Sequence, residues 1–165
     1  MTETAPLRPG MAPRRAAFLA VGLVFVDSLI GQAATFANLV PWYDSLQKPG
    51  FSPPNAVFGP VWTVLYALMA LAFWRMLILP EQKGRKTAIG LFLAQLALNV
   101  LWPWAFFAGH SPLLGLIDIL PQTILVGVTL ALFWRLDRLA GLCLAPLLLW
   151  VGFAAALNFA VWRLN

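Results

Sequence analysis

Residues 139–162 read LAGLCLAPLLLWVGFAAALNFAVW and contain no Asp, Glu, Lys or Arg. Charged residues stand only at the two edges of this run, as Arg138 and Arg163. A helix of about 20 mostly apolar residues is long enough to cross the hydrocarbon core of a bilayer. Because lipid offers the backbone no hydrogen bonds, a segment of this kind crosses as a helix or within a closed barrel.

Four similar segments precede this one. Of the 165 residues, 61% are hydrophobic and 10% are charged, and the mean hydropathy is +0.82. This composition excludes an ordinary soluble domain, and transmembrane strands would show short alternating segments instead. We therefore predict an all-α integral membrane bundle of five transmembrane helices. Its expected parts are a tail at 1–15 and one membrane domain at 16–165, with spans at about 16–37, 58–79, 87–109, 112–134 and 139–162.

Basic residues predict the orientation of these spans. A cleaved signal peptide is the alternative reading of 16–37, but its length and Asp27 in its middle favour a retained helix. With five spans, all of the eleven Lys and Arg except Lys48 and Arg163 lie on the N-terminal side of the membrane. The positive-inside rule then places the N-terminus inside and the first connector outside.

The first connector, 38–57, is longer than a link between two spans requires. It overlaps the stretch WYDSLQKPGFSPPNAVFGPVWTVLY, Trp42 to Tyr66, which holds four prolines and six aromatic residues. Prolines restrict the backbone, so we expect a structured lid over one end of the bundle.

Polar residues inside the spans gather below that lid. With a rise of about 1.5 Å per residue, Asn99 lies about 15 Å from the outer end of its helix. In four of the spans, residues at helical spacing share one face of the helix. These faces hold Trp62, Tyr66, Met69 and Phe73 in the second span, Gln95, Asn99, Trp102 and Phe106 in the third, Asp118 and Gln122 in the fourth, and Trp150, Ala154, Leu157 and Asn158 in the fifth. Two interpretations stay open: these faces form helix contacts, or they line a binding cavity in the outer half.

Several kinds of chemistry have no signature in this chain. It has no phosphate loop, dinucleotide fingerprint, metal cluster or nucleophile motif, and its basic residues form no nucleic-acid-binding face. Cys143, the only cysteine, lies in an apolar run, and His110 is expected in an exposed connector. Asp27 and Asp118 could form a proton relay, but we favour hydrogen bonds between helices for both.

Four motifs carry a resemblance to a known family. They are WYDSLQKPGFSPP (42–54), GPVWTVLYALM (59–69), QLALNVLWPWAFF (95–107) and LNFAVWRLN (157–165). With the five spans, they make the chain similar to the TspO/translocator protein family, also called peripheral-type benzodiazepine receptors.

The resemblance implies a compact bundle, often a homodimer, with a pocket open toward the first loop. Family members bind tetrapyrroles such as protoporphyrin IX, and many bind cholesterol or synthetic isoquinolines and benzodiazepines. It implies a pocket lined by Phe58, Trp62, Asn99, Trp150, Ala154 and Leu157. With the lid and the polar faces, the candidate ligand-binding set is Tyr43, Pro54, Phe58, Trp62, Tyr66, Asn99, Trp102, Asp118, Trp150, Ala154, Leu157 and Asn158.

Three functions follow as alternatives to a scaffold without a physiological ligand. The first is a receptor or carrier for protoporphyrin IX, a related tetrapyrrole, a sterol or another apolar small molecule, acting in porphyrin homeostasis or stress signalling. It would lie in a bacterial membrane and need no obligatory cofactor or metal. The second is light-dependent porphyrin breakdown, which the resemblance assigns to Trp62 and Trp150. The third is an ion-coupled transporter that uses Asp27 and Asp118.

Departures from the family pattern affect two of its ligand classes. Phe159 replaces the tyrosine of the family's cholesterol motif, and Asn55-Ala56 stands where relatives often have a basic residue and a tryptophan. Lys48 is then the only cation in the loop.

Overall fold

Five long helices form the part of the chain that the structure, a computed structural model, describes, namely residues 9–165. Each helix is long and apolar enough to cross a membrane, and no strand occurs in this range. The predicted all-α bundle of five transmembrane helices is therefore confirmed. The helices are α1 (Pro13–Asn38), α2 (Asn55–Ile78), α3 (Arg85–Pro103), α4 (Pro112–Leu136) and α5 (Arg138–Leu164).

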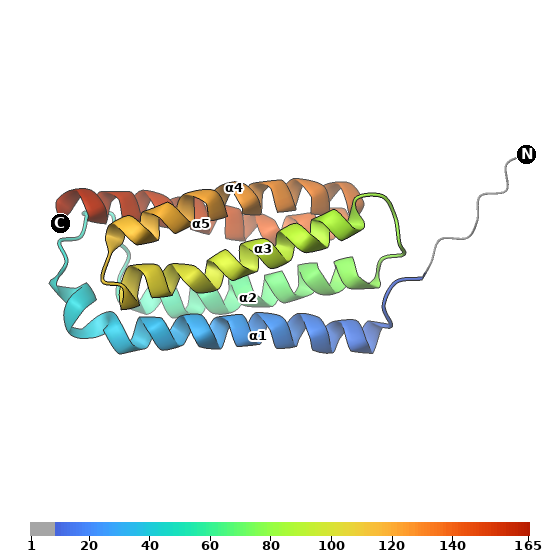
Figure 1. The fold of residues 1–165 in the computed structure, drawn as a ribbon, viewed down its shortest axis with the longest axis horizontal. Helices are drawn as coiled ribbons and strands as arrows, with labels where there is room; N and C mark the ends of the chain where they lie inside the picture. The colour runs from blue at the N-terminus through green and yellow to red at the C-terminus, as the bar shows by residue number, and fades with distance from the viewer. Residues whose placement is uncertain (1–8) are drawn as a thin grey trace, which may run out of the picture.

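Successive helices run in opposite directions, so the connections alternate between the two ends of the bundle (Figure 1). The connection between α1 and α2 lies at the same end as the C-terminus. Neighbouring helices pack in the cyclic order α1, α2, α5, α4, α3 and back to α1. We call the end with the α1–α2 connection the outer end and the opposite one the inner end.

The first connector differs from the predicted loop at 38–57. The chain stays helical after α1 in the π-helical turn η1 (Leu39–Tyr43), and α2 begins earlier than expected, at Asn55. Val40 interrupts the turn with extended angles (φ −120°, ψ 131°), as expected for a residue that precedes a proline. Residues 44–54 are the part that covers the outer end without forming a long helix.

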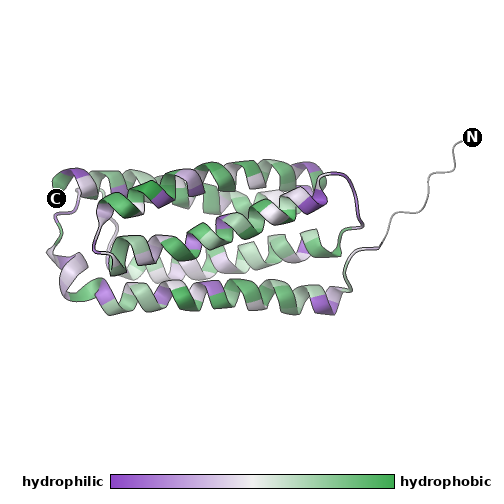
Figure 2. Ribbon diagram, in the orientation of Figure 1, coloured by the Kyte–Doolittle hydropathy of each residue, from purple (hydrophilic) through white to green (hydrophobic). Residues whose placement is uncertain are grey.

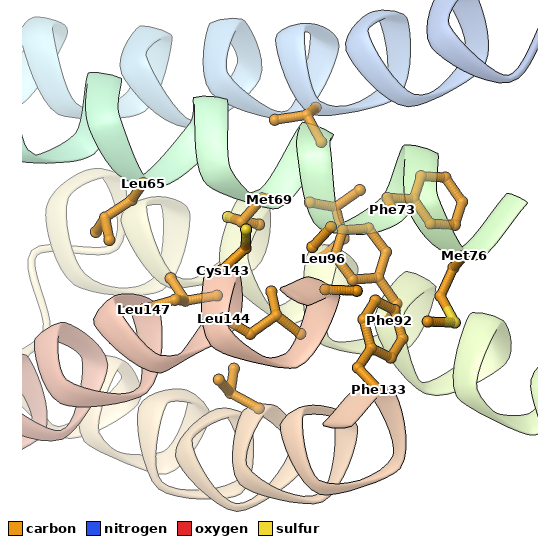
Figure 3. Packing of buried hydrophobic residues seen from close by; sticks show 14 of the residues in the cluster. Leu65, Met69, Phe73, Met76, Phe92, Leu96, Phe133, Cys143, Leu144 and Leu147 are labelled. Carbon is orange, nitrogen blue, oxygen red and sulfur yellow. The ribbon is translucent and has the colours of Figure 1, made fainter. Parts of the chain in front are cut away.

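Aromatic rings fill the inner half of the bundle. Phe73 stacks on Phe92 with ring centroids 4.5 Å apart, and Phe92 stacks on Phe133 at 5.7 Å. Met69 and Met76 are fully buried beside them, and Figure 3 shows this packing among α2, α3, α4 and α5. Because dense packing leaves no void large enough for a ligand, open space in this bundle has to lie elsewhere.

Two side chains secure the inner end. The buried Arg85 guanidinium donates to the Met76 carbonyl oxygen at 2.9 Å and to that of Leu77 at 2.7 Å, which satisfies carbonyls at the end of α2. Asp137 begins α5 and pairs with Arg75 of α2, with Nη2 and Oδ2 2.8 Å apart. Hydrophilic residues are otherwise sparse along the helices and more frequent at their ends (Figure 2).

Candidate functional site

A cavity of about 910 Å³ lies between the helices, and most of its lining residues belong to the outer half of the bundle. All five helices contribute to its wall. We call this outer part of the cavity, below residues 44–54, the chamber. The volume of the whole cavity lies at the upper end of the range for small-molecule sites, about 300–1,000 Å³.

Aromatic side chains form much of the chamber wall. Phe58 meets Trp150 edge to face with ring centroids 5.7 Å apart, and Trp62 lies against Tyr66 at 5.3 Å. Trp102 stacks on Phe106 across the chamber's α3 side, at 5.0 Å. Such faces offer a large apolar contact area to a flat molecule.

One amide joins four helices at the floor of the chamber. Asn99 of α3 donates from Nδ2 to the Asp27 carboxyl of α1 at 2.8 Å and to the Tyr66 hydroxyl of α2 at 3.3 Å. Its Oδ1 accepts from Gln122 Nε2 of α4 at 3.1 Å. Because both ends of the amide have partners, Asn99 is held in one orientation.

A second polar group lies higher, near the outer end. The Trp102 indole donates to Asn158 Oδ1 at 3.1 Å, and Asn158 Nδ2 donates to the Pro112 carbonyl oxygen at 2.7 Å. Gly115 allows this packing, because a Cβ there would come within 2.8 Å of both Asn158 Oδ1 and Phe106. The indole is therefore held against the wall rather than free to turn into the chamber.

We call the outer end of the chamber, beside residues 44–54, its mouth; this segment carries the cation Lys48. Lys48 Nζ lies 4.2 Å from the centre of the Tyr43 ring, which lines the cavity, and 3.6 Å from Asp44 Oδ1. The Asn165 amide holds the same connection, since it accepts from the Gln47 backbone N at 3.0 Å and donates to the Gln47 oxygen at 3.1 Å. The connection is thereby tied to the end of α5.

Most of the predicted site residues meet in the chamber. Those that line it are Tyr43, Phe58, Trp62, Tyr66, Asn99, Trp102, Trp150, Ala154, Leu157 and Asn158. Pro54 and Asp118 are not among the lining residues. Pro54 is instead the residue that precedes α2, and Asp118 is buried in α4.

The two buried aspartates have different surroundings. Asp27 bonds across helices to Asn99, as expected, but neither carboxyl oxygen of Asp118 has a hydrogen-bond partner among residues 9–165. The expected interhelical bond is therefore wrong for Asp118. No hydrogen bond links the two aspartates within the described range, so the structure offers no direct relay between them.

The exposed connector at His110 also forms contacts. His110 is exposed, as expected, yet its ring stacks on Trp42 with centroids 4.8 Å apart, and its Nε2 lies 3.1 Å from Asn38 Oδ1.

Among the described residues no three His, Cys, Asp or Glu side chains are grouped so that they could hold a metal ion.

Comparison with known proteins identifies the family of this chain. Residues 16–163 match the model of the TspO/MBR family. The chain belongs to this family. It is 37% identical to the tryptophan-rich protein TspO of Chlorobaculum tepidum over 89% of this chain and 94% of that one. It is 40% identical to protein CrtK of Rhodobacter capsulatus (75% and 78% covered) and 34% identical to the human translocator protein (88% and 89%).

As a TspO/MBR protein with five membrane-crossing helices, the chain is a multi-pass integral membrane protein.

The predicted ligand-binding set contained no residue of α1, although this helix lines the cavity. Ser28, Gln32 and Thr35 line the cavity from α1, with the spacing i, i+4, i+7 of one helix face. That spacing was available in the sequence, but the partner of Asp27 was not.

Proposed function

We propose that this TspO/MBR protein is a membrane receptor or carrier that holds a tetrapyrrole, or a similarly flat apolar molecule, in the chamber. One observation carries the proposal: a cavity of about 910 Å³ whose outer part is lined by indole and phenyl rings, with hydrogen-bonded amides at its floor and on one side. The names of relatives, "tryptophan-rich sensory protein" and "translocator protein", support sensing or carriage.

Charge favours one arrangement of such a ligand. No Lys, Arg or His lines the cavity, and the carboxyl of Asp27 lies directly behind the floor. Lys48 stands at the mouth. A buried carboxylate without a cationic partner is costly, so the acidic edge of a porphyrin should face the mouth and its apolar edge the floor.

Replacement of two chamber indoles tests the proposal. Trp62→Phe and Trp150→Phe should each weaken protoporphyrin IX binding by about tenfold, because each shortens an aromatic face that the ring contacts, and tenfold corresponds to about 1.4 kcal/mol. The measurement is quenching of tryptophan fluorescence in detergent. Trp134→Phe, an exposed indole on α4 outside the cavity, serves as the matched control. Equal affinities for all four proteins would exclude the chamber as the site.

We also propose that the N-terminus faces the cytoplasm and that the mouth of the chamber opens to the opposite side. The inner end holds Arg75, Arg85 and Arg138, in keeping with the positive-inside rule. Single cysteines placed in a Cys143→Ser background provide the measurement. A cysteine at Gln47 should react with an impermeant maleimide on intact cells, and one at Gln82 should not; the reverse pattern would contradict the assignment.

A further inference from the structure

The cavity does not end at the chamber. Helices α3, α4 and α5 line the cavity only in the outer half. On α3 the lining begins at Asn99, on α4 it ends at Gln122, and on α5 it begins at Trp150. In contrast, α1 lines it from Ala17 onward and α2 as far as Trp74. The cavity therefore continues inward as a furrow between α1 and α2, over about 16 Å from Ser28 to Ala17 at the helical rise.

The furrow is apolar along its length. Its walls hold Ala17, Val21 and Phe25 on α1 and Ala67, Leu71 and Trp74 on α2. The one polar side-chain atom among them, Trp74 Nε1, already donates to the Pro13 carbonyl oxygen at 3.1 Å. Hydrogen-bonding groups are thus confined to the chamber, and the furrow suits only hydrocarbon.

The furrow also faces the bilayer. Val21 is 58% exposed and Phe25 59% exposed, on the outer surface of a bundle that lipid surrounds. The two parts of one cavity differ in polarity: a chamber with aromatic walls and amides, and an apolar furrow that leads inward from its floor. A molecule that matches both parts has a polar or flat head and a hydrocarbon tail.

We propose that the furrow accommodates the hydrocarbon tail of an amphiphile whose head occupies the chamber. This inference rests on the proposed function and narrows its ligand class to tail-bearing, esterified tetrapyrroles or amphiphiles of similar build. A tail ester also removes a carboxylate, which suits a cavity that no cation lines. Because lipid is as apolar as the furrow, moving the tail from lipid into the furrow adds little affinity. The furrow instead gives the tail space, so that a tailed ligand can bind in the chamber without a steric clash against α1 or α2.

Two pigments with the same ring test the inference: pheophorbide a methyl ester, without a tail, and pheophytin a, its phytyl ester. The wild-type protein in detergent should bind both with affinities within about threefold of each other, by tryptophan quenching. Ala67→Trp fills the furrow, so it should weaken pheophytin a binding by about tenfold or more and change methyl ester binding by less than about twofold. Leu71→Trp is a second furrow variant, in case the first does not fold.

Ala131→Trp, which adds the same side chain at an exposed position of α4 outside the cavity, should change neither affinity. A wild-type protein that binds the methyl ester but not pheophytin a would overturn the inference and leave the proposed function standing. Equal loss of both pigments in folded furrow variants, or loss of neither, would also overturn it. Failure of the wild type to bind either pigment would contradict the proposed function itself.

Discussion

Asp137→Ala is expected to lower the free energy of unfolding by about 2 to 4 kcal/mol, because one carboxyl group serves two purposes. Its Oδ1 accepts from the backbone N of Leu139 at 2.9 Å and of Ala140 at 3.1 Å, and so caps α5. Its Oδ2 accepts from Arg75 Nε at 2.8 Å, which ties α5 to α2. Alanine removes the cap and leaves the Arg75 guanidinium without its partner.

The pH dependence of this contribution has a definite sign. Burial acts to raise the pKa of the Asp137 carboxyl, but the hydrogen bonds from Arg75 and the α5 backbone and the charge of Arg75 outweigh burial and lower it. A lowered pKa in the folded state means that the contribution is complete above the ordinary value of about 4 and disappears as the pH falls through the folded-state pKa.

Thermal unfolding in detergent at a series of pH values measures both effects. Asp137→Ala should unfold several degrees below the wild type at about pH 7, and the gap should narrow below about pH 4 as the wild-type carboxyl takes up a proton. Asp44→Ala is the matched control, because Asp44 is exposed and its carboxyl pairs with Lys48 across 3.6 Å rather than capping a long helix. A gap that stays constant down to about pH 3 would show that the charge of Asp137 plays no part.

Asn99→Leu is expected to lower the free energy of unfolding by about 2 to 3 kcal/mol. The substitution removes three hydrogen bonds, each worth about 1 kcal/mol in a membrane protein. The change also leaves the Asp27 carboxyl and the Gln122 amide buried without their partner. It should further weaken porphyrin binding, because the floor of the chamber loses its fixed shape.

A second change separates network loss from simple misfit. In the Asn99→Leu background, Asp27→Leu should restore part of the lost stability, because it replaces an unpaired polar group with an apolar one. The measurement is the apparent unfolding temperature of the wild type, both single variants and the double variant. If the two single losses simply add, Asp27 and Asn99 are not coupled, and the four-helix network makes no joint contribution.

Sequence reasoning located the five helices because apolar runs of this length, each with at most one charged residue, have few alternatives to crossing a bilayer. It was weaker at deciding which side of a helix faces inward. Phe18 is 83% exposed and Phe92 is fully buried, although both lie in apolar helices. In a membrane both faces of a helix are apolar, so hydrophobic periodicity does not separate a lipid-facing residue from a core residue.

The aromatic and amide residues of the candidate site could be predicted from the sequence, because polar groups are costly in lipid and therefore point into the bundle. That argument assigned Asn99 and Trp102 to the chamber but also assigned Asp118, which lies in the bundle without lining it. Burial alone does not tell which interior surface a side chain meets. The same holds for the furrow, whose alanines and valines look like any other apolar residues in the sequence.

The central claim, a flat macrocycle held between chamber indoles, is tested most directly by ¹⁹F NMR of protein labelled with 5-fluorotryptophan. Protoporphyrin IX has a strong ring current, so on titration it should shift the signals of Trp62, Trp102 and Trp150, which line the chamber, and leave Trp134 unchanged. Tryptophan-to-phenylalanine variants assign the signals. Shifts confined to Trp134 or other indoles outside the cavity, with the three chamber signals unmoved, would contradict the account.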